Sequence, residues 1–100
     1  MNRRALSELD GEIITLGDQP GGQEQALFFV CPICPDGHGI IVQWQGRSIY
    51  PSGVIWRRVA GSTPADVTFE PSINCDVTQK SGAPSDCKFH GWVRGGHVEW

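Results

Sequence analysis

The chain has 100 residues, of which 39% are apolar and 19% are charged, with 13 glycines and 7 prolines. This composition excludes a disordered chain and fits one domain with a modest core and many turns. The formal net charge of −3 argues against a general nucleic-acid-binding protein, because an acidic protein repels phosphate backbones. No apolar run reaches the roughly 18 residues of a membrane span, and the first ten residues lack the apolar core of a secretion signal. We therefore expect a cytoplasmic protein with no membrane segment.

The N-terminal part of the chain is predicted to combine a short arm with a first strand. Residues 1–10 can form one or two helical turns with Leu6 and Leu9 on one side. So short a helix is marginal in water, and we expect a weakly held arm over residues 1–11. Residues 12–16 read as a strand, and residues 12–100 are expected to form a single zinc-binding, β-rich domain.

A cysteine pair at the tip of a hairpin is the most informative motif. Residues 26–30 form a continuous apolar run, typical of a strand covered on both faces, and lead directly into Cys31. Cys34 follows after two residues, which allows both sulfurs to bind one tetrahedral zinc ion. Residues 39–44 are rich in β-branched side chains and are predicted to return as the partner strand. Thiols stay reduced in the cytoplasm, so the four cysteines favour metal binding over disulfides.

The middle of the chain contains two further predicted strands and a segment without pattern. Residues 54–59 are rich in strand-forming side chains, and residues 67–70 alternate between apolar and polar. Pro71 stops the second strand because it cannot donate to a ladder. Residues 72–86 show little periodicity, so we predict no element there.

The C-terminal end is predicted to be a hairpin. Gly95 and Gly96 suit the positive φ angles of a two-residue turn, which would pair Val93 with Val98. A slip of one residue would exchange the two faces of the hairpin. With the register as proposed, the inner face holds Phe89, Val93, Val98 and Trp100, and the outer face holds His90, Trp92, Arg94, His97 and Glu99.

The other half of the zinc site is expected from Cys87 and His90, which repeat the two-residue gap. Together with Cys31 and Cys34 they give a Cys3His set, and four protein ligands are typical of structural zinc. Two further side chains are reserve ligands, since either could replace the histidine of this set: Cys75 and His38.

Several short motifs occur in order between residues 28 and 100. They are Phe29-Val30-Cys31-Pro32-Ile33-Cys34, Trp56, Thr68-Phe69-Glu70-Pro71-Ser72-Ile73, Cys87-Lys88-Phe89-His90 and Val98-Glu99-Trp100. In order and spacing they resemble a family of small uncharacterised proteins, a domain of unknown function found in bacteria, their phages and mobile elements. The resemblance implies a compact, mostly β domain with the four zinc ligands named above, and no established activity. Pro35 departs from the usual pattern, because it cannot donate a hydrogen bond to a sulfur.

These observations predict an all-β or β-rich, small zinc-ribbon-like domain of antiparallel hairpins with a short N-terminal arm. The leading functional hypothesis is a protein-interaction module with a structural zinc ion, whose partner is another protein; the resemblance adds an expected association with phages or mobile elements. Trp92, beside Arg94 and His97 on the outer face, is typical of a binding hot spot. An enzyme is disfavoured, because three thiolates and a fourth protein ligand leave zinc closed and electron-rich.

Two other functions stay open at this point. The first is a zinc-dependent hydrolase with an open metal position, in which His38 or Asp36 would move the proton. The second is a nucleic-acid-binding zinc-ribbon-like module, which would show a steep salt dependence of affinity. The sequence does not indicate an oligomeric state.

Overall fold

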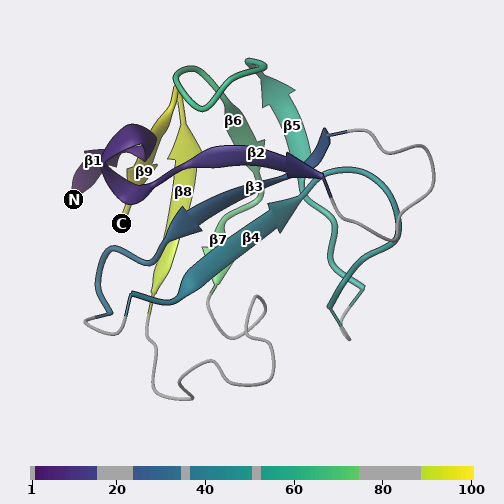
Figure 1. The fold of residues 1–100 in the computed structure, drawn as a ribbon, viewed down its shortest axis with the longest axis horizontal. Coiled ribbons are helices and arrows are strands. Elements are labelled where there is room, and N and C mark those ends of the chain that lie inside the picture. The colour runs from purple at the N-terminus through teal and green to yellow at the C-terminus, as the bar shows by residue number, and fades with distance from the viewer. Residues whose placement is uncertain (1, 16–23, 35–36, 51–52, 75–88) are drawn as a thin grey trace.

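The computed structural model describes residues 2–15, 24–34, 37–50, 53–74 and 89–100. Within these ranges the chain forms short strands and a single 3-10 helix (Figure 1). The predicted β-rich fold of antiparallel hairpins is confirmed. The elements are β1 (Arg3–Ala5), η1 (Leu6–Leu9), β2 (Glu12–Thr15), β3 (Glu24–Val30), β4 (Gly39–Gln43), β5 (Arg57–Ala60), β6 (Thr68–Glu70), β7 (Ile73–Asn74), β8 (His90–Arg94) and β9 (His97–Glu99).

The described strands form three antiparallel groups. One group has the order β1-β9-β8-β7, the second has the order β2-β3-β4, and the third pairs β5 with β6. In Figure 1 the ribbons of β2, β3 and β4 cross in front of β8 and β7. Side chains from both groups belong to one buried cluster, so the core lies where the two groups face each other.

The central strand β3 supplies much of this core. It lies between β2 and β4 and pairs with both. Leu27 and Phe29 are fully buried, and the Phe29 ring meets the edge of the Phe89 ring with centroids 6.1 Å apart. Burial of each such side chain contributes about 1.5–3 kcal/mol to stability. The apolar run in the sequence therefore forms the strand that it predicted, and Phe89 connects this strand to the start of β8.

The N-terminal segment differs from the expected weakly held arm. Strand β1 pairs with β9 along its whole length, and Leu6 and Leu9 of the 3-10 helix are buried in the core. The Leu6 N–H also donates to the carbonyl of Gly96 at 2.9 Å. A helix considered alone is marginal, but here the sheet provides hydrogen-bond partners and the core accepts both leucines. The chain order places this segment first, whereas the fold places it beside the last strand (Figure 1).

The C-terminal hairpin has the register that the glycine pair predicted. Val93 pairs with Val98, and both are fully buried. Gly95 and Gly96 have φ angles of 54° and 80°, a region that glycine enters without a steric penalty. Because side chains alternate across a strand, this register sends His90 and the polar side chains of β8 to the outer face.

Two strands in the middle of the chain depart from the sequence pattern. The strand expected over residues 54–59 forms as β5 only from Arg57 onward, while the preceding Trp56 is buried. Strand β7 has two residues, Ile73 and Asn74, and no periodicity can reveal so short an element. It pairs with β8 and so extends the first group by one strand. Among the described residues, no helix is long and apolar enough to cross a membrane.

Candidate functional site

The turn after β3 brings together three side chains that can bind a metal. Ligand atoms of Cys31, Cys34 and His38 all lie within 4.8 Å of one another. The turn is closed by two backbone hydrogen bonds, from the Cys31 N–H to the His38 carbonyl at 2.9 Å and from the Gly37 N–H to the Cys34 carbonyl at 3.2 Å. Cys31 is buried, and the other two ligands are half-buried. The cysteine pair that the sequence singled out is therefore joined by the reserve ligand His38.

The donor set of this turn fits a zinc ion. Two thiolates and an imidazole are ligands that zinc accepts, and neither cysteine is in a disulfide. Bond lengths of about 2.0–2.3 Å in a tetrahedron place ligand atoms about 3.3–3.8 Å apart. The observed separations of up to 4.8 Å would have to shrink by about 1 Å, which small side-chain rotations can supply. A fourth ligand would complete the tetrahedron.

The remaining predicted ligands lie elsewhere or outside the described residues. His90 is exposed on the outer face of β8 and is not a member of the group in the turn. Its Nε2 atom lies 2.9 Å from the Oγ atom of Ser72, and its ring centroid lies 5.3 Å from that of Trp92. Cys75 and Cys87 lie outside the described residues, so their part in the predicted site stays a prediction.

The contact between Ser72 and His90 follows from the pairing of β7 with β8. Ile73 lies opposite Gly91, and Asn74 lies opposite His90. Extended by one residue, this register sets Ser72 opposite Trp92 and makes His90 the diagonal neighbour of Ser72. Diagonal neighbours on one face of a sheet are within reach of a long side chain. The hydroxyl and the imidazole therefore meet on the outer face, while Ile73 and Gly91 are buried.

The backbone of Ser72 is tied to the core by a buried tryptophan. The indole Nε1 of Trp56 donates to the Ser72 carbonyl at 3.3 Å. Trp56 is only 2% exposed, its own N–H donates to the Gln43 carbonyl at 2.8 Å, and the ring of Tyr50 packs edge-on against it. Because the indole cannot move without disturbing these contacts, it holds the serine backbone in place.

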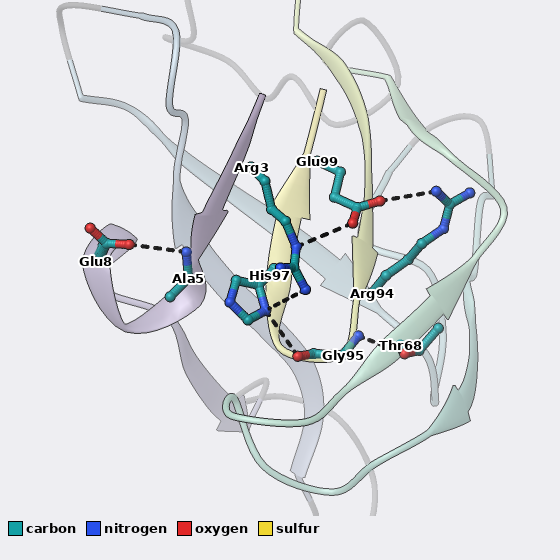
Figure 2. Close-up of polar contacts among 8 residues, drawn as sticks. All are labelled: Arg3, Ala5, Glu8, Thr68, Arg94, Gly95, His97 and Glu99. Carbon is teal, nitrogen blue, oxygen red and sulfur yellow. Dashed lines mark hydrogen bonds and ion pairs between the residues drawn. The ribbon is translucent and has the colours of Figure 1, made fainter. Parts of the chain in front are cut away.

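A groove is lined by Ser72 together with residues of β6 and β8. Its volume is about 450 Å³, and polar and apolar side chains share its surface. Two of the three residues predicted for binding, Trp92 and Arg94, line it. The third, His97, lies apart, with its Nδ1 atom 3.1 Å from the Gly95 carbonyl oxygen and 3.3 Å from the guanidinium of Arg3 (Figure 2). The groove is lined by Thr68, Phe69, Glu70, Pro71, Ser72, Trp92 and Arg94.

A charged cluster holds the edge of this groove. The Glu99 carboxylate accepts from Arg94 at 3.0 Å and lies 3.4 Å from the Nε atom of Arg3, between the two guanidinium groups (Figure 2). Only 16% of the Glu99 side chain is exposed, so water screens these pairs less than it screens pairs on open surface. The Arg94 guanidinium also lies 5.2 Å from the centre of the Trp92 ring. Both groove residues are thereby fixed from the side of β9.

A serine hydroxyl within hydrogen-bond distance of an imidazole is the arrangement that nucleophilic catalysis requires. The sequence did not single out Ser72, because it lies between proline and isoleucine and outside any glycine-flanked nucleophile motif. Its presence in the Thr68–Ile73 motif was the only signal. The link to His90, 18 residues away, depends on strand pairing that the sequence pattern did not show.

Comparison with known families agrees with this chemistry. Residues 2–100 match the family described as the bacterial ubiquitination-like system serine protease (BubE), and the chain therefore belongs to that family. No curated protein and no solved structure matches the chain. The matched family is a bacterial one, as the resemblance implied, whereas the description of the family as uncharacterised does not hold.

The family overturns the functional hypothesis drawn from the sequence. A protein-interaction module without an activity of its own is wrong as the function, because the family is described by a proteolytic activity. The zinc hydrolase fares no better, since a serine protease attacks with a serine hydroxyl and not with a metal-bound water. A nucleic-acid-binding module likewise does not fit a family that is described by a proteolytic activity. The expectation of a non-enzyme loses its support for the same reason. It depended on a closed zinc site, which says nothing about a serine elsewhere on the domain.

Proposed function

We propose that this member of the BubE family is a serine hydrolase of a bacterial ubiquitination-like system, with Ser72 as nucleophile and His90 as general base. The observation that carries the proposal is the distance of 2.9 Å between the His90 Nε2 atom and the Ser72 Oγ atom. This distance is within the range of about 2.6–3.2 Å that a nucleophile and its base need. The groove beside the hydroxyl offers room for a substrate carbonyl.

The first half of the reaction forms an ester on Ser72. The Nε2 atom of His90 takes the hydroxyl proton while the Oγ atom attacks the carbonyl carbon of a peptide bond. The tetrahedral intermediate collapses, the C–N bond breaks, and the imidazolium gives its proton to the leaving amine. The second half repeats these steps with water. His90 takes a proton from water, the hydroxide attacks the ester, and the Ser72 oxygen recovers a proton as the carboxylic acid leaves.

The substrate under this proposal is a protein, in line with the protein partner expected from the sequence. Trp92 and Arg94 line the groove and would contact the chain on one side of the bond that is cleaved. A flat aromatic ring beside a guanidinium group is a common combination at contact surfaces. The half-open shape of the groove suits an extended segment of a larger substrate.

For the metal we propose zinc, held by Cys31, Cys34 and His38, with Cys87 as the predicted fourth ligand. The support for Cys87 is its place in the chain. It lies two residues before Phe89, whose ring packs on Phe29 near the end of β3. Two residues reach at most about 7 Å. Cys75 stays a reserve ligand, while His90 is needed by Ser72. When bound, the ion would hold the turn after β3.

A fluorophosphonate reagent tests the nucleophile, because it reacts with an activated serine hydroxyl. We expect one label per chain, which peptide mass analysis should locate at Ser72. Ser72→Ala should remove the label, and His90→Gln should slow labelling about 100-fold or more. Ser7→Ala is the matched control, since Ser7 is exposed and lies on η1, away from this pair. Labelling at another serine, or at full rate in His90→Gln, would refute the proposal.

A further inference from the structure

We infer that Trp92 is the positioning residue of the His90 imidazole and takes the place that a carboxylate has in a serine–histidine–aspartate triad. The inference rests on the proposed pair of Ser72 and His90. In such a triad the carboxylate has two tasks. It holds the imidazole in the reactive orientation, and it stabilises the imidazolium that forms when the serine gives up its proton.

No carboxylate of the described residues lies within ion-pair distance of His90. The ring of Trp92 lies beside the imidazole instead, with centroids 5.3 Å apart and planes tilted by 34°. A tryptophan face attracts a cation through its quadrupole, and the attraction exists only once the imidazole is protonated. Contact with a large flat ring also restricts rotation of the imidazole. The two tasks of a triad carboxylate can therefore be met by this one side chain.

Trp92 is itself held from two sides. His90, Trp92 and Arg94 form a row on the outer face of β8, because alternate residues of a strand share a face. Across the hairpin Trp92 pairs with Glu99, whose carboxylate binds Arg94 and Arg3 (Figure 2). The guanidinium of Arg94 lies 5.2 Å from the Trp92 ring. The tryptophan is thus set between the imidazole and a fixed guanidinium.

A second cation near an imidazolium would oppose its formation if it were unpaired. Here the Glu99 carboxylate lies 3.0 Å from Arg94, so much of that charge is offset within the pair. The attraction between the Trp92 face and the imidazolium then stands without strong repulsion from Arg94. Glu99 and Arg94 therefore support the tryptophan and have no direct contact with the proton that moves.

A competing explanation is that Trp92 only binds substrate, since it also lines the groove. The two explanations predict different kinetics. If Trp92 only binds substrate, its substitution should raise the concentration needed for half-saturation and leave the rate of the chemical step unchanged. If Trp92 positions the imidazole, its substitution should slow the chemical step and leave the concentration for half-saturation almost unchanged. The dependence of the fluorophosphonate labelling rate on reagent concentration gives both quantities, the limiting rate and the concentration needed for half-saturation.

The experiment compares Trp92→Leu, Trp92→Phe and the control Trp44→Leu. Trp44 is a matched control, because it is also half-buried and has a guanidinium, that of Arg58, 4.8 Å from its ring centre. We expect Trp92→Leu to lower the limiting labelling rate of Ser72 about 3- to 30-fold. Trp92→Phe should restore most of the rate, because it keeps an aromatic face. Trp44→Leu should stay within about twofold of the native rate.

An NMR measurement provides a second readout. The ring protons of His90 lie near an indole and should be shifted by its ring current, and Trp92→Leu should remove that shift. An unchanged limiting rate in a folded Trp92→Leu protein would overturn the inference about Trp92. If Ser72→Ala is not labelled in the same experiment, the proposal that Ser72 is the nucleophile still holds. If native Ser72 is not labelled at all, the proposed function fails first. Should Trp92→Leu not fold, Trp92→Met, which keeps a long apolar side chain, makes the same comparison.

Discussion

The turn from Cys31 to His38 and the pair of Ser72 with His90 are built in opposite ways. The turn gathers its ligands from eight consecutive residues, closed by two short-range backbone hydrogen bonds. The pair joins residues that are 18 positions apart, through the register of β7 with β8. A short motif can thus indicate a candidate metal site, while the proposed reacting groups become visible only after the strands are paired.

The two regions also differ in burial. Cys31 belongs to the hydrophobic core and is 3% exposed, whereas His90 is exposed on the outer face of the sheet. A change in the turn should therefore act on folding, and a change in the pair should act on chemistry alone. Variants in the turn and in the pair should therefore show whether the two regions act separately.

The largest effects are expected from Cys31→Ser and His90→Gln, compared side by side. Cys31→Ser should abolish the proposed zinc binding and lower the melting temperature strongly, because structural zinc sites contribute about 10–16 kcal/mol of apparent binding free energy. His90→Gln should keep its zinc and its melting temperature while labelling of Ser72 falls about 100-fold or more. Metal analysis and thermal melting of both variants provide the measurements.

The same two variants can also show that the turn and the pair of Ser72 with His90 are not separate. If His90→Gln loses zinc together with Cys31→Ser, then the Cys3His site expected from the sequence is correct and His90 is no longer available to Ser72. Ser72→Ala serves as the control, because it should leave both the zinc content and the melting temperature unchanged.

An intermediate effect is expected from Trp56→Phe, which removes the indole N–H that holds the Ser72 carbonyl. The lost hydrogen bond should lower the free energy of unfolding by about 1 kcal/mol, and the smaller ring adds a cavity cost. The labelling rate of Ser72 should fall several-fold, because its backbone is less well held. Urea unfolding and labelling measure the two effects. A stable variant with the native labelling rate would show that the indole has no part in positioning the serine.

The smallest effect is expected from Asp66→Ala, a change at a residue that belongs to neither region. Its carboxylate accepts from the backbone N–H of Thr63 at 2.8 Å, from the N–H of Ser62 at 3.0 Å and from the Thr63 hydroxyl at 3.0 Å. These hydrogen bonds favour the charged form and lower the pKa of Asp66 below its usual 3.8.

A lowered pKa in the folded state means that the carboxylate stabilises the fold above pH 3.8, and that this contribution is lost as the pH falls through the lower folded value. Thermal melts between about pH 2 and pH 6 should show Asp66→Ala slightly less stable than the native protein near pH 6 and equal to it at the acid end. Labelling of Ser72 near neutral pH should not change. A difference in stability that is independent of pH would exclude the charge as its cause.

Sequence patterns that span only a few residues were sufficient to predict much of the fold. The apolar run before Cys31 became the central strand, because a strand that lies between two others and is covered on both faces can bury a continuous apolar run. Gly95 and Gly96 set the register of the last hairpin, since a tight turn leaves the flanking strands no other pairing that buries both Val93 and Val98. The spacing of Cys31 and Cys34 likewise indicated the metal-binding turn, because two cysteines so close in the chain can reach one ion whatever the rest of the fold.

Contacts between distant segments decided the rest. The leucines of η1 are buried because β1 adds to β9, and a pattern in ten residues holds no information about that partner. The two-residue strand β7 is too short for any periodicity, yet its pairing with β8 carries the Ser72 hydroxyl to the His90 imidazole. Hydrophobic alternation specifies which face of a strand is buried, but the neighbour of each strand is chosen by the packing of the whole core. The sequence therefore pointed to the turn with the candidate metal ligands, and only the folded arrangement revealed the proposed catalytic pair.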